Sequence, residues 1–191
     1  MAKLRQVLSG NVAKLEVNLK EIFGDELPND TEFRQAFGQA IIDRIRDRTA
    51  DNIDRNGKRF RNYSQEYADS IEFKAYNKSK GDPNLKQTGD MLNLMDIIEE
   101  RENKIVIGWQ TDEEAGKAHG HVTGNVGVKR DFLGLPDGEV EALAREFRGQ
   151  VFSTSELPSV VRTEAFLAGE VTISPRQTLG SIVRSIFDDE A

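Results

Sequence analysis

The chain has no cysteine, one tryptophan and only two histidines among its 191 residues. The missing thiols exclude disulfides and thiolate-bound metal centres, and their absence is typical of a reducing compartment. No apolar stretch approaches the roughly 20 residues that would span a bilayer, and the first residues lack the continuous apolar core of a secretory signal. We therefore expect a polar globular protein that makes no use of a membrane.

Acidic residues outnumber basic ones by 33 to 26, which gives a formal net charge of −7. This balance argues against nucleic-acid binding by the surface as a whole. Basic residues nevertheless concentrate between residues 44 and 61, where seven of them accompany three acidic ones. This segment is either a solvated helix face with i,i+4 partners or a patch that faces DNA or an acidic neighbour. The candidate patch residues are Arg55, Lys58, Arg59 and Arg61.

Hydrophobic periodicity predicts two helices in the first third of the chain. Over residues 3–23, apolar side chains recur at steps of three and four, which predicts an amphipathic helix; they are Leu4, Leu8, Val12, Leu15, Leu19 and Ile22. A longer helix of about 25 residues is expected to begin at Asp30 or Thr31, both suitable N-caps, and to end at Gly57. At 1.5 Å per residue such a helix would cross a sheet.

Three further helices are predicted. One covers residues 64–76, is capped by Ser64 and turns Ile71 inward. The next follows Pro136 and Asp137 and runs to about Phe147. The last follows Ser174-Pro175, where proline takes the first helical position.

Alternating apolar residues predict a β-hairpin formed by residues 91–100 and 104–110, in which Ile105, Ile107 and Trp109 share one face. Residues 111–128 are rich in glycine and polar side chains and are predicted to be a loop, and 170–173 a short strand. The expected fold is α+β, an antiparallel sheet packed against a long helix and shorter helices, with helical N- and C-terminal extensions. The expected boundaries are 1–28 for the N-terminal amphipathic extension, 29–148 for the core domain and 149–191 for the C-terminal extension.

The sequence contains no pattern that assigns catalysis. His119 and His121 would face the same side of a strand and could there form one edge of a metal site, but two histidines in a glycine-rich loop are the simpler interpretation. Adjacent carboxylates such as Glu99 and Glu100 would point to opposite faces of a strand, so they do not imply a shared acid–base site. We therefore predict no enzyme activity, no metal and no cofactor.

Four residues are candidates for a subunit interface: Trp109, His121, Arg130 and Phe132. Trp109 is either a core residue or an interface anchor, because tryptophan is enriched at the energetic centres of interfaces. Arg130 lies beside a bulky apolar pair in the segment 129–133. It is either a plain loop charge or a cation that fixes the loop or reaches a neighbouring subunit.

The order and spacing of several segments between residues 31 and 148 resemble the virion-morphogenesis family of tailed phages, which includes tail-completion and tail-terminator-like proteins. The matching positions are Gly57 with Tyr63–Ala68, then Leu85, Thr88, Gly89 and Leu92, then Ile105, Ile107 and Gly108, then Ala118, His121 and Gly124, and last Arg130, Phe132, Leu133 and Gly134. Lys117 stands where the family usually has tyrosine, and Val128 where it has proline.

The resemblance implies a structural virion protein at the head–tail junction, either a tail terminator or an adjacent completion protein of the neck. It implies a homomeric ring, with six copies expected, that contacts the tail tube or sheath and the head connector. DNA would pass through the lumen without specific binding, and an acidic lumen would let it slide. The rival hypothesis is a nucleic-acid-binding module that uses the basic segment from Arg44 to Arg61.

Overall fold

The computed structural model describes residues 3–155 except 77, 84, 86–89 and 126. The chain divides into two compact units, Met1–Leu143 and Ala144–Ala191. The first unit contains the sheet and every candidate site residue. The strand predicted at 170–173 and the helix predicted after Pro175 lie outside the described residues.

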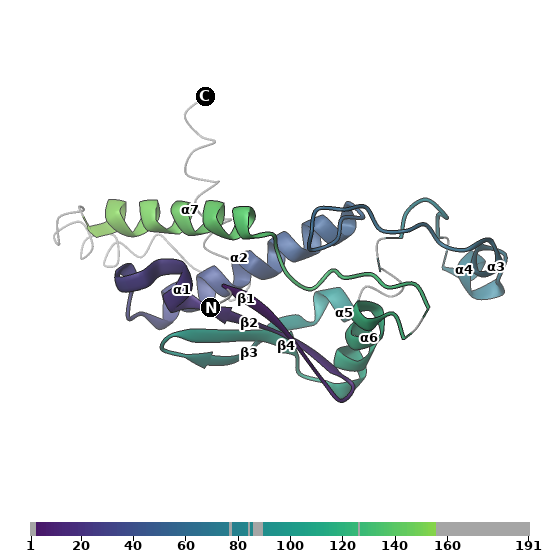
Figure 1. The fold of residues 1–191 in the computed structure, drawn as a ribbon, viewed down its shortest axis with the longest axis horizontal. Helices are drawn as coiled ribbons and strands as arrows, with labels where there is room; N and C mark the ends of the chain where they lie inside the picture. Colours follow the sequence, from purple (N-terminus) through teal and green to yellow (C-terminus); the bar gives the residue numbers. More distant parts are fainter. Residues whose placement is uncertain (1–2, 77, 84, 86–89, 126, 156–191) are drawn as a thin grey trace, which may run out of the picture. The chain divides into compact units, whose positions relative to one another are not determined.

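An antiparallel four-stranded sheet forms the base of the first unit, which confirms the α+β fold (Figure 1). Its strands are β1 (Leu4–Ser9), β2 (Val12–Asn18), β3 (Met95–Arg101) and β4 (Lys104–Trp109), in the spatial order β1-β2-β4-β3. The predicted hairpin is confirmed as β3 and β4, which pair from Met95↔Trp109 to Arg101↔Lys104. Its first strand begins at Met95 and not at residue 91, because Asp90–Asn93 form a short helix. The central pair, β2 with β4, joins segments that are far apart in the sequence.

The helix predicted over residues 3–23 is wrong. This segment forms β1, β2 and only a short helix, α1 (Leu19–Phe23). Along β2 every second residue is buried (Ala13, Leu15 and Val17), and Gly10 at φ 57° opens the two-residue turn between the strands. Residues 1–28 are therefore no extension, because β2 lies in the middle of the sheet.

The long helix, α2 (Thr31–Ala50), begins as predicted. The side chain of Asp30 accepts a hydrogen bond from the backbone N–H of Glu32 at 2.9 Å. The helix ends at Ala50, well before Gly57, because Asn52 adopts the left-handed conformation at φ 63°. The chain then forms a loop in which Ile53 and Arg59 make an isolated bridge.

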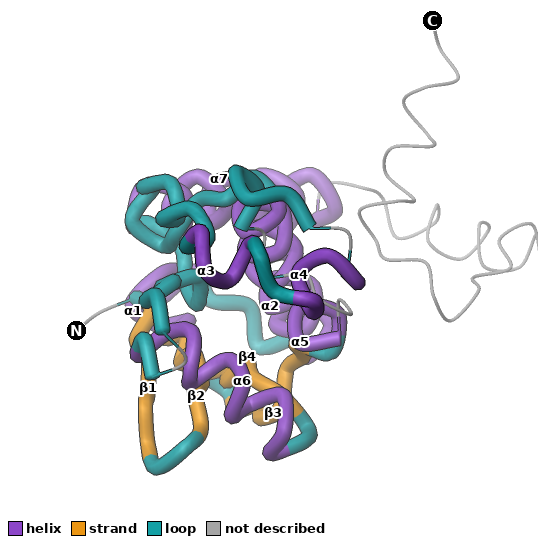
Figure 2. The backbone as a smooth tube through the Cα atoms, turned by 90° about the vertical axis from the view of Figure 1, so that its right-hand side faces the viewer, coloured by secondary structure: helices purple, strands orange, loops and turns teal. Residues whose placement is uncertain are grey.

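The helices cover one face of the sheet, as Figures 1 and 2 show for α2. Gly38 allows α2 to approach closely, since a Cβ at this position would lie 2.5 Å from Ile97 Cδ1 and 2.7 Å from Ile105 Cδ1. The opposite face of the sheet carries charged side chains beside Val106, which is the strand partner of Glu16. There Glu16 pairs with Arg5 at 2.6 Å and with Lys104 at 3.3 Å.

The remaining elements are η1 (Gly24–Glu26), α3 (Gln65–Ala68), α4 (Ile71–Ala75), α5 (Asp90–Asn93), α6 (Asp112–Thr123) and α7 (Asp137–Ser155). The single helix predicted over 64–76 is two short helices, because Ser70 begins a second one with its own side-chain cap. Ile71 was predicted to point inward but is 87% exposed, and Phe73 is buried instead.

The loop predicted over residues 111–128 is also wrong, since most of it is the helix α6. Thr111 caps the N-terminus, and Gly124 ends the helix at φ 88°. The helix α7 begins at Asp137, one residue before the predicted start, and continues beyond Phe147 to Ser155. No helix in the described part of the chain is both long and apolar enough to cross a membrane.

Candidate functional site

Three aromatic rings form a cluster between the end of the α2 loop and the α3–α4 pair. The ring centres of Tyr63 and Tyr67 lie 5.3 Å apart, and that of Phe73 lies 5.4 Å from each. Tyr63 and Phe73 are buried, whereas Tyr67 is half-buried. The serine caps of α3 and α4 place Tyr67 and Phe73 on the side of Tyr63.

Two cations lie over these rings. The guanidinium carbon of Arg130 is 4.8 Å from the centre of the Tyr63 ring. The ammonium of Lys78 is 5.4 Å from the Tyr63 centre and 5.7 Å from the Tyr67 centre, and it donates a hydrogen bond to the Tyr67 hydroxyl at 3.4 Å. All three distances to ring centres are within the range of cation–π attraction. We call Tyr63, Tyr67, Lys78, His121 and Arg130 the Arg130 cluster.

His121 brings α6 into this cluster. The backbone N–H of Arg130 donates to the carbonyl oxygen of His121 at 2.8 Å. Burial, together with the positive charges of Arg130 and Lys78, lowers the pKa of His121 to about 4, so the imidazole is neutral at pH 7. Its Nδ1 is buried and has no hydrogen-bond partner among the described residues.

Arg130 is a buried charge that has no counterion among the described residues. Its side chain is 6% exposed, its Nε is buried without a hydrogen-bond partner, and no carboxylate of the described residues forms an ion pair with it. Burial lowers the pKa of Arg130, but a guanidinium stays protonated in proteins. Because an uncompensated buried charge is costly, this residue needs an explanation beyond packing.

The candidate basic patch is adjacent to the cluster. The N–H of Arg55 donates to the carbonyl oxygen of Asp131 at 2.8 Å, which joins the loop after α2 to the segment of Arg130. The carboxylate of Asp54 accepts from the backbone N–H groups of Asn56 and Lys58, both at 2.8 Å, and so shapes the loop. Within the described chain, none of the four patch residues (Arg55, Lys58, Arg59 and Arg61) has an ion-pair partner.

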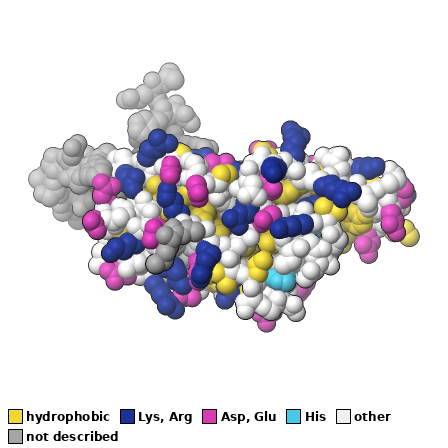
Figure 3. All heavy atoms as spheres, viewed as in Figure 1, with side chains coloured by type: hydrophobic (Ala, Val, Ile, Leu, Met, Phe, Trp, Pro, Cys, Tyr) yellow, Lys and Arg dark blue, Asp and Glu magenta, His cyan; other side chains and the backbone are white. Residues whose placement is uncertain are grey.

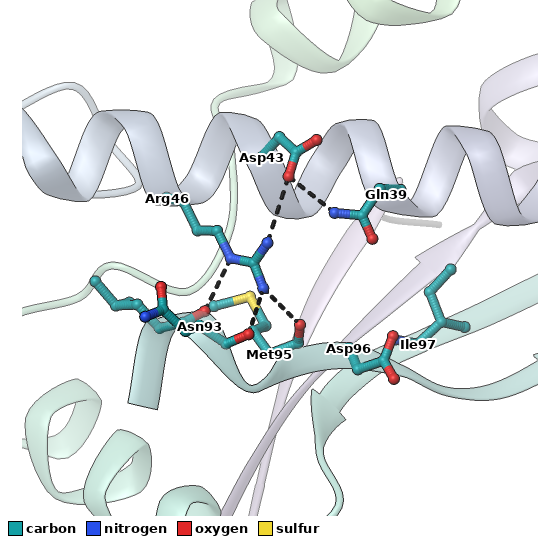
Figure 4. Close-up of polar contacts among 8 residues, drawn as sticks. Gln39, Asp43, Arg46, Asn93, Met95, Asp96 and Ile97 are labelled. Atoms are coloured by element: carbon teal, nitrogen blue, oxygen red, sulfur yellow. Dashed lines mark hydrogen bonds and ion pairs between the residues drawn. The ribbon is translucent and has the colours of Figure 1, made fainter. Parts of the chain in front are cut away.

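The helical part of the basic segment has a different use, which Figure 4 shows. Arg46 donates from Nε to the carbonyl of Leu92 at 2.9 Å and from Nη2 to those of Asn93 and Met95 at 2.8 and 2.9 Å. Arg46 therefore fastens α2 to the start of β3, beside a shallow depression of about 310 Å³ that Leu94 also lines. Arg48 pairs with Glu139 and donates to the carbonyl of Asp54. Both cations serve the fold.

The other two candidate interface residues, Trp109 and Phe132, belong to the core. They are 6% and 1% exposed, and their ring centres lie 6.4 Å apart. The indole N–H of Trp109 donates to the carbonyl of Met91 at 2.5 Å. Of the two interpretations of Trp109, the structure supports the first, a core residue within one chain.

The histidine pair cannot act as one metal edge. His119 and His121 lie on α6, where residues two apart point about 200° away from each other around the helix axis. Across the residues that the structure describes, no three His, Asp or Glu side chains lie together in a way that could hold a metal ion.

The structure brings His121 and Arg130 together with the patch residue Arg55, and it separates Trp109 and Phe132 from the surface. Sequence reasoning missed Lys78, which lies between the predicted helix 64–76 and the predicted strand that begins at residue 91. The only signal was the four-residue spacing of Tyr63 and Tyr67. No known protein family, curated protein or solved structure matches this chain. The residues themselves therefore carry the functional argument.

Proposed function

We propose that this protein is a structural virion component at the head–tail junction of a tailed phage, a tail terminator or a completion protein of the neck, and that it forms a homomeric ring. One observation supports the proposal most. Tyr63, His121 and Arg130 belong to three separate segments of the pattern that resembles the phage family, and they meet in one cluster. Residues that a family pattern fixes for a common purpose are expected to meet in this way.

The edges of the sheet are consistent with a subunit of a larger assembly. Among the described residues, β1 and β3 each pair on one side only. The β3 edge has a bulge between Ile97 and Glu99, a feature that discourages pairing with a further strand. The β1 edge is regular over its whole length, and Leu8 near its end is 44% exposed. Of the two edges, β1 is the better suited to pair with a neighbouring copy.

A ring requires contacts between two different surfaces of the same subunit, which close on themselves after a fixed number of copies. The net charge of −7 suits a component through which DNA passes, because like charge keeps DNA from adhering to the walls. The ring copy number expected from the family resemblance is six. The neighbours would be the tail tube or sheath on one side and the head connector on the other.

Mass measurement tests the oligomer directly. Purified protein at micromolar concentration is expected to sediment as one closed oligomer and to appear as rings in negative-stain micrographs. Phage produced without this gene product is expected to accumulate unjoined heads and tails. A strictly monomeric protein, together with normal joining of head and tail in its absence, would overturn the proposal.

A nucleic-acid-binding module is the second candidate, and the unpaired cations Arg55, Lys58 and Arg59 favour it. If it is correct, replacing these three with glutamine weakens duplex DNA binding and makes the slope of log K against log salt shallower by about 2 to 3. Replacing Arg46 with lysine serves as the control, because Arg46 is engaged with backbone carbonyls. No DNA retention at moderate salt by the unchanged protein contradicts this candidate.

A further inference from the structure

Most of the basic residues that have no ion pair among the described residues lie in one region of the first unit; Lys14 and Lys20 are exceptions. Eight of them, Arg55, Lys58, Arg59, Arg61, Lys78, Lys80, Lys129 and Arg130, lack an ion pair among the described residues. Hydrogen bonds join their segments, from Arg55 to Asp131 at 2.8 Å and from the Tyr63 N–H to the carbonyl of Lys80 at 3.3 Å. By contrast, cations such as Arg5, Arg34 and Lys104 pair with carboxylates.

Acidic residues gather at the other end of the same unit. Residues 21–32 include five carboxylates and no basic residue: Glu21, Asp25, Glu26, Asp30 and Glu32, all exposed. This segment contains the end of α1 and the start of α2. Figure 1 shows α1 near one end of the unit and the α3–α4 pair at the opposite end. On the face drawn in Figure 3, basic and acidic side chains occur at both ends, so the separation concerns these two sets of residues and not the whole surface.

We propose that Lys78 and Arg130 are one half of a head-to-tail contact between copies of this chain, completed by carboxylates of residues 21–32 from the neighbouring copy. The proposal rests on the ring described above and names the residues that hold it together. Arg130 is the observation that requires a ligand, since a guanidinium only 6% exposed forms no ion pair with any carboxylate of the described residues. The acidic segment lies at the far end of its own unit, so a second copy must supply it.

The geometry of the cluster suits a carboxylate. Lys78 and Tyr67 are half-exposed and form its accessible side, whereas Arg130 and Tyr63 are buried. A carboxylate placed beside Lys78 would accept hydrogen bonds from its ammonium and would also balance the charge of Arg130, because both cations lie over the Tyr63 ring. Charge-assisted hydrogen bonds of this kind are among the stronger contacts at interfaces.

A head-to-tail contact has a distinctive signature in mixing experiments. A receiver variant (Lys78→Gln with Arg130→Met) and a donor variant (Asp25→Asn with Glu32→Gln) should each fail to form rings. Mixed in equal amounts, they retain one intact pairing, the cluster of the donor variant with the acidic segment of the receiver variant. We expect this mixture to form a dimer and no ring, measured by sedimentation velocity. A control variant, Lys14→Gln with Asp112→Asn, changes exposed residues on other surfaces and should form rings as the unchanged protein does.

The single change Lys78→Gln removes only a half-exposed side chain, so it separates loss of contact from loss of folding. It should raise the dissociation constant of the assembly at least tenfold, roughly the effect of losing one buried charge-assisted contact. The subunit should still unfold in one cooperative thermal transition, with a melting temperature lowered only slightly by the lost contacts with Tyr63 and Tyr67. If the unchanged protein forms rings and all these variants do too, the inference fails while the proposed function stands. If the unchanged protein is monomeric, the proposed function itself fails. Rings that persist while the receiver variant loses DNA retention would assign the cluster to phosphate and overturn the inference.

Discussion

Arg130 and Tyr63 are far apart in the sequence, yet the guanidinium carbon of the first lies 4.8 Å from the ring centre of the second. The backbone N–H of Arg130 also donates to the carbonyl of His121 at 2.8 Å. One residue thus connects the loop after α2 with the end of α6. The charge of Arg130 is not needed for either contact. The hydrogen bond to His121 is made by the backbone, and an apolar side chain would fill the space over the Tyr63 ring.

Replacement of Arg130 by methionine should therefore leave the free energy of unfolding unchanged or raise it by about 1 kcal/mol. Methionine keeps most of the volume and removes an unpaired buried charge. The lost cation–π attraction, about 1 to 2 kcal/mol, opposes this gain. Urea denaturation at pH 7 measures the result.

Arg34 provides the matched control for this experiment. It is 8% exposed and pairs with Glu100 at 2.8 Å. Arg34→Met leaves that carboxylate without its partner, so we expect a loss of about 3 kcal/mol. Equal losses in the two variants would show that Arg130 is an ordinary structural cation.

Acid should weaken the fold through His121. Its pKa is lowered to about 4 in the folded protein, below the 6.5 of an unperturbed histidine. The unfolded chain therefore binds this proton more readily, so the stability that His121 contributes is complete above pH 6.5 and is lost as the pH falls toward 4. Between pH 7 and pH 5 we expect a decrease of about 1 to 2 kcal/mol.

Two histidine variants isolate this effect. His121→Gln has no titrating group at the cluster and should lose much less stability between pH 7 and pH 5 than the unchanged protein. His119→Gln should keep the full decrease, since His121 remains. The midpoints of urea denaturation at pH 7 and pH 5 measure this loss of stability in each variant. If His121→Gln loses as much stability as the unchanged protein, the pH dependence does not come from His121.

The sequence was sufficient to predict the β3–β4 hairpin but not to predict the strands β1 and β2. Leu15 and Leu19 are four apart, a spacing that fits one face of a helix and also one side of a strand. The partner that decides between them is β4, whose Ile107 pairs with Leu15 from a distant part of the chain. Local periodicity contains no information on such a partner. The Gly10-Asn11 turn was the one local sign of a hairpin.

The candidate site was predictable to the extent that its residues belonged to the resemblance pattern, as His121 and Arg130 do. Lys78 was not, because its contacts with Tyr63 and Tyr67 depend on tertiary packing. The helix α6 was missed since Gly116 and Gly120 lower helix propensity. The caps at Thr111 and Gly124 and the packing of α6 against β2 together outweigh that cost.

Two glycines on different helices should respond in opposite directions to alanine. At Gly38 the new Cβ would lie 2.5 Å from Ile97 Cδ1 and 2.7 Å from Ile105 Cδ1, so these buried side chains must shift or α2 must move away from the sheet. We expect a loss of about 1 to 3 kcal/mol. At Gly116 the nearest atom is the carbonyl oxygen of Asn11 at 3.8 Å, an ordinary contact. There the higher helix propensity of alanine should add about 0.5 to 1 kcal/mol. Thermal denaturation compares the two, and stabilisation by Gly38→Ala would refute the close packing of α2.

Arg46→Lys tests whether the basic segment acts through charge or through geometry. The guanidinium of Arg46 reaches three carbonyls at once, those of Leu92, Asn93 and Met95. Lysine keeps the charge but has no planar fork, so some of these buried acceptors lose their donor, at a cost of about 1 to 2 kcal/mol. Arg59→Lys is the control: Arg59 is exposed and has no ion pair in the described chain, and its replacement should change the free energy of unfolding by no more than about 0.5 kcal/mol.

Urea denaturation at low and at high salt should give the same difference in stability between the two variants, because carbonyl acceptors are not screened as charges are. A difference that vanishes at high salt would mean that Arg46 acts as a charge, and the division of the basic segment into a structural half and an unpaired half would then be wrong.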